Sequence, residues 1–168
     1  ITSIGKLLNN GSIIKIGDGS HNMSPKDKDL DNNGINYIQA GDIDVYGINY
    51  NKIKKVTLDY YNKVDKGFIE PNMICLAGMG TTGISCIYDA KTNGLTNRST
   101  IAIKVNEKDI NIQFLNYWFN SIYFNYQIAI DPSCGTRDLI SMTKINKTKI
   151  VLPNIEKQKE IVEQLEKL

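Results

Sequence analysis

The hydrophobic positions between residues 71 and 105 fall into three short runs separated by turns. Met73–Ala77 is a continuous apolar run, as is typical of a strand buried on both faces. The runs at 84–88 and 101–105 are rich in β-branched residues, which favours two further strands. Glycines follow the first run, and Asn93-Gly94, a strong turn signal, follows the second. The pattern therefore predicts strand–turn–strand units at the centre of the fold.

The glycines after the first run match a nucleotide-binding pattern, because Gly78, Gly80 and Gly83 fit G-x-G-x-x-G. That mechanism needs a helix to begin at the third glycine, so that its amides and dipole face the pyrophosphate. The residues that follow are β-branched instead, and Ile84 stands where a Walker-type loop has its lysine. A turn between strands is favoured, and a nucleotide-binding enzyme built on this loop is the lesser alternative.

Periodicity along the rest of the chain predicts a globular α+β domain with a small twisted sheet and flanking helices. We expect further strands at 13–16, 35–39, 52–56 and 149–152, and helices at 57–64, 112–124, 141–146 and 154–168. Thr57 and Asn154 are suitable helix caps. Apolar positions 115, 118, 119 and 122 recur at helical spacing, which predicts a helix face that covers the sheet.

Composition excludes fibrous, disordered and membrane-spanning classes. The chain has 168 residues, 41% hydrophobic and 23% charged, which suits one globular domain. Its formal net charge of +2 permits a nucleic-acid partner without requiring one. Three cysteines at no metal spacing favour reduced thiols and a cytoplasmic protein, with Cys75 and Cys86 as core residues. No apolar run reaches the roughly 18 residues that span a bilayer, and we expect no membrane partner.

Two polar segments, 17–34 and 133–138, interrupt the regular pattern. Loops longer than about 12–15 residues are usually functional or disordered. The first segment carries His21, the only histidine, so no two-histidine metal site can form. No Ser–His–acid spacing and no acidic nuclease cluster is visible either. The sequence therefore predicts no catalytic residue and no metal site.

Four pieces of sequence stand in a distinctive order along nearly the whole chain. They are Asp18-Gly19-Ser20-His21 with Ser24-Pro25-Lys26, the glycine turn at 78–83, Gly135-Thr136-Arg137, and Ile150-Val151-Leu152-Pro153 followed by Glu156-Lys157-Gln158-Lys159-Glu160-Ile161-Val162. This order resembles the target recognition domain of DNA-specificity (S) subunits in type I restriction–modification systems. The last piece is the most specific, because it marks where such a domain joins its conserved helix.

The resemblance implies a domain that reads one half of a bipartite DNA site and does no chemistry. Residues 1–153 would form the recognition domain, and 154–168 would begin the conserved or dimerisation helix. S-adenosylmethionine, ATP and magnesium would bind partner subunits, and this chain would hold no cofactor. Expected partners are double-stranded DNA, the methyltransferase and restriction subunits, and a second copy or half-subunit. A domain of a fused restriction–methylation enzyme, a half-sized dimerising specificity protein and a plain protein-interaction domain are the alternatives.

Candidate contact residues lie mostly in loops, where donors and acceptors can reach base edges and basic side chains can reach phosphates. The DNA-binding candidates are Ser20, His21, Asn22, Lys26, Lys28, Thr81, Thr82, Asn97, Arg98, Thr136, Arg137, Lys144 and Lys147. Arg98 and Arg137 are the only arginines, and their planar forks suit bidentate recognition of guanine or phosphate. An apolar stripe on the last helix is expected to pack against another helix: Ile161, Val162, Leu165 and Leu168.

Overall fold

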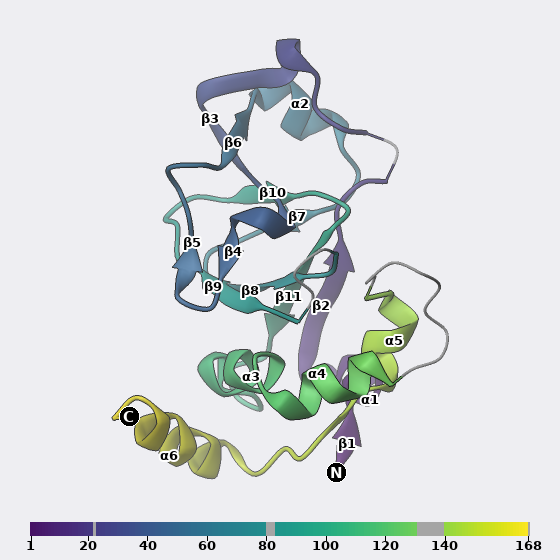
Figure 1. Cartoon of the computed structure of the whole chain (residues 1–168), viewed down its shortest axis with the longest axis vertical. Coiled ribbons are helices and arrows are strands. Elements are labelled where there is room, and N and C mark those ends of the chain that lie inside the picture. The colour runs from purple at the N-terminus through teal and green to yellow at the C-terminus, as the bar shows by residue number, and fades with distance from the viewer. Residues whose placement is uncertain (22, 80–82, 131–139, 168) are drawn as a thin grey trace.

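The computed structural model describes residues 1–21, 23–79, 83–130 and 140–167 (Figure 1). Its first four-stranded sheet contains, in spatial order, β2 (Ile13–Asp18), β11 (Thr100–Val105), β8 (Met73–Ala77) and β9 (Ser85–Tyr88), and every neighbouring pair is antiparallel. The three strands expected at the centre of the fold are thus confirmed. The connection expected between the second and third is wrong, however, because β11 pairs with β8 and not with β9.

The chain between β9 and β11 contributes instead to a second four-stranded sheet, where the sequence predicted only one sheet. Its spatial order is β6 (Lys54–Val56), β3 (Leu30–Ile38), β10 (Gly94–Thr96) and β7 (Phe68–Ile69), and only the β3–β10 pair is parallel. Gly94 begins β10 rather than ending a turn. A Cβ atom there would lie 2.8 Å from the Tyr88 hydroxyl, so this glycine serves a close approach between the sheets.

Several short elements lie outside the two four-stranded sheets. Two antiparallel pairs are formed by β1 (Thr2–Ser3) with β12 (Lys149–Ile150) and by β4 (Ile43–Asp44) with β5 (Gly47–Ile48). Two single-turn 3₁₀ helices, η1 (Asp27–Asp29) and η2 (Ala40–Asp42), flank β3. The polar segment expected to extend to residue 34 ends earlier, since β3 already begins at Leu30 and is irregular before Ile35. Its first residues are polar and exposed, which hid the strand from an apolar pattern.

The helices of the described residues are α1 (Ile4–Asn9), α2 (Leu58–Lys63), α3 (Ile112–Phe119), α4 (Ile122–Ala129), α5 (Met142–Lys147) and α6 (Ile155–Leu165). Each is capped by the side chain of a serine, threonine or asparagine, including the predicted caps Thr57 and Asn154. The single helix expected at 112–124 is wrong, because Ser121 caps a new helix. Ile122 consequently leaves the apolar face and is 79% exposed.

The two sheets pack face to face, with helices outside (Figure 1). Along β8, Ile74 and Leu76 face the cluster made with α1, α3, α4 and α5, while Cys75 and Ala77 face the second sheet. Helix α2 covers the far side of the second sheet through Tyr60 and Val64. Cys75 and Cys86 are free thiols in the core, as expected. No helix in these ranges is long and apolar enough to cross a membrane.

Helix α6 packs against α3, which changes the interpretation of its apolar stripe. Val162 is only 7% exposed, so it belongs to the body of this chain rather than to a free helix face. Leu165 is 42% exposed, and Leu168 lies outside the described residues. The fully buried Gln158 accepts a hydrogen bond from the Asn111 amide, and its own amide donates to the Asp109 and Pro153 carbonyl oxygens.

Candidate functional site

Three connections meet at one point: β2 to β3 and β10 to β11, which run between the two sheets, and α2 to β7, which leads back into the second sheet. The Gly19 amide donates to the Asn97 carbonyl oxygen at 3.1 Å, and the Thr96 amide donates to the Gly67 carbonyl oxygen at 2.7 Å. Ser20 adds an isolated parallel bridge to Asn97. Segments that lie far apart in the sequence are therefore joined backbone to backbone.

Two glycines make this close approach possible. A Cβ atom on Gly19 would stand 2.0 Å from the Thr96 carbonyl oxygen, which no side chain can occupy. Gly67 has φ of +88°, and a Cβ atom there would come within 2.8 Å of the Gly19 Cα. The glycine of the Asp18-Gly19-Ser20-His21 motif thus serves backbone packing, and it places Ser20 and His21 beside the β10–β11 turn.

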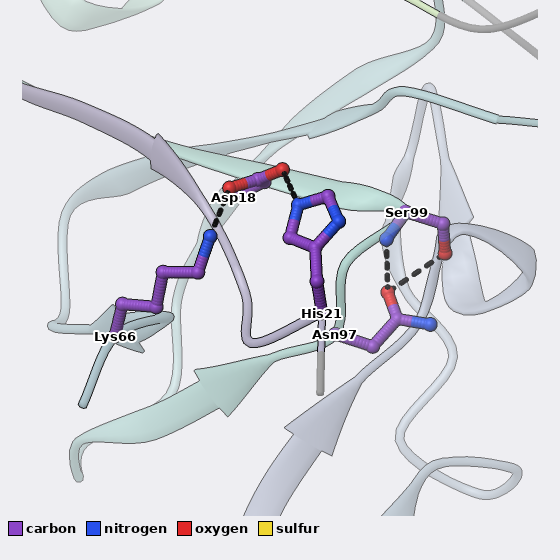
Figure 2. A network of polar contacts seen from close by, with 5 residues as sticks. All are labelled: Asp18, His21, Lys66, Asn97 and Ser99. Carbon is purple, nitrogen blue, oxygen red and sulfur yellow. Dashed lines mark hydrogen bonds and ion pairs between the residues drawn. The ribbon is translucent and has the colours of Figure 1, made fainter. Parts of the chain in front are cut away.

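Asp18, at the end of β2, links two of these connections through its carboxylate (Figure 2). One oxygen lies 2.5 Å from His21 Nε2, and the other accepts from Lys66 Nζ at 3.0 Å. Partial burial opposes ionisation of Asp18, but the hydrogen bonds from His21 and Lys66 outweigh it, so the pKa of Asp18 lies below its ordinary value. The carboxylate is therefore ionised and holds His21 and Lys66 beside each other.

Asn97 organises the β10–β11 turn from within. Its side-chain oxygen accepts hydrogen bonds from the Ser99 amide at 3.1 Å, the Ser99 hydroxyl at 2.7 Å and the Thr100 hydroxyl at 3.0 Å. Figure 2 shows the carboxamide turned toward Ser99. Arg98 stands exposed next in the chain, and no ion pair joins it to another residue of the described ranges.

A hollow of about 410 Å³ opens where these loops meet. Its described lining residues are Asp18, His21, Gly78, Met79, Arg98, Ile101, Ile140, Ser141 and Met142. The backbone of Gly78 links two of its walls, because its amide donates to the Ser99 carbonyl oxygen and its carbonyl oxygen accepts from the Ile140 amide, both at 2.8 Å. The start of α5 and the β10–β11 turn are thereby held on either side of the glycine turn.

The glycine turn itself leads into a strand. Gly83 has φ of +79° and is followed by β9, so the helix that a dinucleotide-binding loop requires does not follow it. Helices α3 and α4 hold the far side of the turn, since Asn125 donates to the Gly83 carbonyl oxygen at 3.4 Å and Asn120 bonds both backbone groups of Ser85. The favoured interpretation, a turn between strands, agrees with this geometry.

A smaller hollow of about 120 Å³ lies on the other side of Arg98. Among the described residues, its lining is formed by Ser20, Ser24, Pro25, Tyr37, Gln39, Lys54, Asn97 and Arg98. Arg98 therefore stands between two concave surfaces, the larger with apolar walls and the smaller mostly polar. If a ligand covers both hollows, the Arg98 side chain can enter a groove of that ligand.

Of the residues predicted from the sequence, Ser20, His21, Asn97 and Arg98 come together here. Lys26, Lys28 and Lys147 are exposed at η1 and α5. Lys144 is only 4% exposed, which does not suit a contact to DNA phosphate. Six predicted residues lie outside the described residues: Asn22, Thr81, Thr82, Thr136, Arg137 and Leu168. Sequence reasoning missed Lys66, Met79, Ser141 and Met142, since no local motif links them to the loops they face.

Residues 6–168 match a family model described as the type I restriction modification DNA specificity domain. No curated protein matches the sequence. A chain from a structural study of complex assembly and conformational transition of the type I R-M system is similar in fold, with TM-score 0.68, 15% identity, and coverage of 99% of this chain and 37% of that one.

Two further structures are similar, both of specificity subunits. The HsdS subunit from Thermoanaerobacter tengcongensis has TM-score 0.66 and 16% identity over 91% of this chain and 34% of its own. The S subunit from M. genitalium has TM-score 0.60 and 16% identity over 93% and 36%. The chain thus spans about a third of the length of these relatives.

Proposed function

The chain belongs to the type I restriction modification DNA specificity domain family, and we propose that it reads the base sequence of double-stranded DNA as one recognition domain of a specificity subunit. One observation carries this proposal. Loops that are up to about 120 residues apart in the sequence converge on a single concave surface, with Arg98 and His21 exposed at its edge. Such a surface combines donors for base edges with a shape that a groove can follow.

The charges of the surface support reading of bases over attraction to phosphates alone. The chain has a net charge of only +2, so its overall charge contributes little attraction to DNA. Lys66 and His21 both contact the Asp18 carboxylate. Arg98 is exposed and forms no ion pair within the described residues, so its side chain is available to contact a base. Lys26, Lys28 and Lys147 are also exposed, and their charges are suited to phosphate contacts that position the domain.

Catalysis would belong to partner subunits. We expect this chain neither to methylate nor to cut DNA, and we expect S-adenosylmethionine, ATP and magnesium to act on the methyltransferase and restriction subunits of a complete system. The family description, which names DNA specificity, supports this division. We expect the assembly to act in the cytoplasm.

Helix α6 would contribute to assembly through the apolar side chains that its own domain does not fully cover. Val162 is covered by its own domain, so Ile161 and Leu165 carry the contact to another helix, either of a partner subunit or of a second copy. Replacing Ile161 and Leu165 with aspartate is expected to weaken association in light scattering and pull-down with the methyltransferase subunit. Lys159→Ala, an exposed change on the same helix, is the control, and unchanged assembly contradicts the proposal.

Selection from a pool of randomised duplexes tests the DNA-reading function. The chain is expected to enrich one short sequence and to bind it more tightly than unrelated duplexes of equal length. Affinity for both kinds of duplex should fall with salt, because phosphate contacts release counterions. Selected and unselected duplexes bound equally, at every salt concentration, would contradict reading by this chain.

A further inference from the structure

The large hollow has an apolar interior within a polar surface. Ile101 and Ile140 are 2% and 3% exposed and form its floor, and the half-buried side chains of Met79 and Met142 stand beside them. Asp18, His21 and Arg98 contribute the polar part of the lining. Ile101 and Ile140 belong to the core of the domain, so the apolar surface that a ligand can contact in the hollow comes mainly from Met79 and Met142. An apolar surface of this kind is suited to an apolar group of a ligand and has no counterpart in phosphate.

The edges of base pairs offer one apolar group to such a floor. In the major groove, guanine, cytosine and adenine present donors and acceptors, whereas thymine also presents its 5-methyl group. An arginine next to that methyl group can lie against the pyrimidine and donate both fork hydrogens to an adjacent guanine. Arg98 lines the hollow and is exposed, so its side chain is available for such a contact.

We propose that the hollow bounded by Met79, Ile101, Ile140 and Met142 receives the 5-methyl group of a thymine in the major groove, next to a base pair whose edge Arg98 contacts. The inference rests on the proposed function and names a base that this site selects. Thymine is then distinguished from cytosine at that position by its methyl group as well as by its hydrogen-bonding edge.

Asp18 argues for a base edge over a phosphate as the occupant. Its carboxylate lines the same hollow and is kept ionised by His21 and Lys66. A phosphate group that entered the hollow would be repelled by this negative charge. Lys66 does not favour the phosphate, because it is already paired with Asp18. The methyl group is uncharged, so the carboxylate does not oppose its entry.

The two methionines have fixed backbones and adaptable side chains. Met79 follows Gly78, whose amide and carbonyl oxygen are both hydrogen-bonded to neighbouring segments. Met142 is the first residue of α5, which Ser141 caps through a hydrogen bond from the Lys144 amide. The hollow is far larger than one methyl group, and unbranched methionine side chains can close around the methyl edge of a pyrimidine.

Replacement of thymine by deoxyuridine tests the inference directly, since only the methyl group is removed. The selected duplex is prepared with each thymine replaced in turn, and dissociation constants are measured by fluorescence anisotropy with the whole chain. One position is expected to lose affinity about fourfold, as for one methyl group removed from an apolar contact, while the others change less than about twofold.

Protein variants locate the contact. In Met79→Ala and Met142→Ala, the ratio of deoxyuridine to thymine dissociation constants at that position is expected to fall toward one. Met79→Gln and Met142→Gln, which keep side-chain length, should do the same if an alanine variant fails to fold by circular dichroism. Met23→Ala is the matched control, because Met23 packs near Tyr60 in a separate cluster and does not line the hollow.

The outcomes separate this inference from the proposed function. Sequence-specific binding with no sensitive thymine, or a ratio unchanged in both methionine variants, overturns the methyl contact and leaves DNA reading intact. Absence of sequence-specific binding overturns the proposed function itself. A sensitive position whose ratio collapses in the hollow variants, and not in the Met23 control, supports the inference.

Discussion

Gly19 lies against Thr96 so closely that a Cβ atom on Gly19 would stand 2.0 Å from the Thr96 carbonyl oxygen. This approach brings the β2–β3 connection, with Ser20 and His21, onto the turn that carries Arg98. The two loops can therefore adopt this relative position only because Gly19 has no Cβ atom.

Gly19→Ala is accordingly expected to destabilise the fold by about 3 kcal/mol, because the backbone at Thr96 must move. Urea denaturation measures the change in free energy of unfolding. Gly17→Ala is the matched control: a Cβ atom at Gly17 has nothing within 4 Å, so its effect should stay within about 1 kcal/mol. Equal stability of the two variants would mean that the backbones at Gly19 and Thr96 can move apart without loss of folding free energy.

Asn97 is expected to position Arg98 rather than to read a base itself. Reading adenine needs both the oxygen and the nitrogen of an asparagine side chain, and the oxygen of Asn97 already accepts from Ser99 and Thr100. Asn97→Ala should lower the free energy of unfolding by about 1–3 kcal/mol, and Asn97→Asp, which keeps an acceptor, should lower it less. Selection with Asn97→Asp discriminates between the roles: a changed base at one position would show direct reading.

Local chemistry allowed much of the fold to be predicted from the sequence, and long-range packing limited the rest. A continuous apolar run identified β8, a run rich in β-branched residues identified β11, and side-chain caps identified the starts of α2 and α6. Gly94 misled the prediction, because its turn signal and its close approach to Tyr88 call for the same residue. The partners of β10 lie on β3 and β7, far along the chain, and no local pattern encodes that pairing.

The residues of the candidate site were also only partly predictable from the sequence. Ser20, His21, Asn97 and Arg98 stood out as polar residues in predicted loops, and they do meet. Lys66 joins His21 only through Asp18, and a salt bridge across 48 positions has no local signal. Methionine is a typical core residue, so the sequence did not single out Met142. It reaches the hollow only because α5 lies beside the glycine turn.

Gln158 is expected to hold α6 onto the domain. It is fully buried and forms three hydrogen bonds, to the Asn111 amide and to the Asp109 and Pro153 carbonyl oxygens. Gln158→Leu leaves these backbone groups without partners and should destabilise the fold by about 2–4 kcal/mol. Hydrogen exchange should quicken in α6 first. Gln164→Ala, at an exposed position on the same helix, is the control, and similar exchange in both variants would argue against this role.

The lowered pKa of Asp18 predicts a loss of stability in acid. Because the folded state lowers this pKa from 3.8, the unfolded chain binds the proton more readily. The contribution of Asp18 is therefore complete above about pH 4 and is lost as pH falls through the folded-state pKa. It should be below about 1 kcal/mol, since solvent screens the partly exposed pair with Lys66. Asp18→Asn should flatten this part of the stability curve, and an unaltered slope would contradict the assignment.

Arg98 is expected to discriminate between sequences more than it attracts DNA in general. Its fork can donate two parallel hydrogen bonds to guanine, whereas lysine keeps the charge and loses that geometry. Arg98→Lys should weaken binding of the selected duplex by about 1–3 kcal/mol and leave binding of unrelated duplexes nearly unchanged. Because the charge is kept, the dependence of affinity on salt should also stay the same. Lys159→Ala on α6 is the control for a distant change of charge. A uniform loss across all duplexes would make Arg98 a phosphate contact, and no loss in either comparison would place the DNA on a different face of the domain.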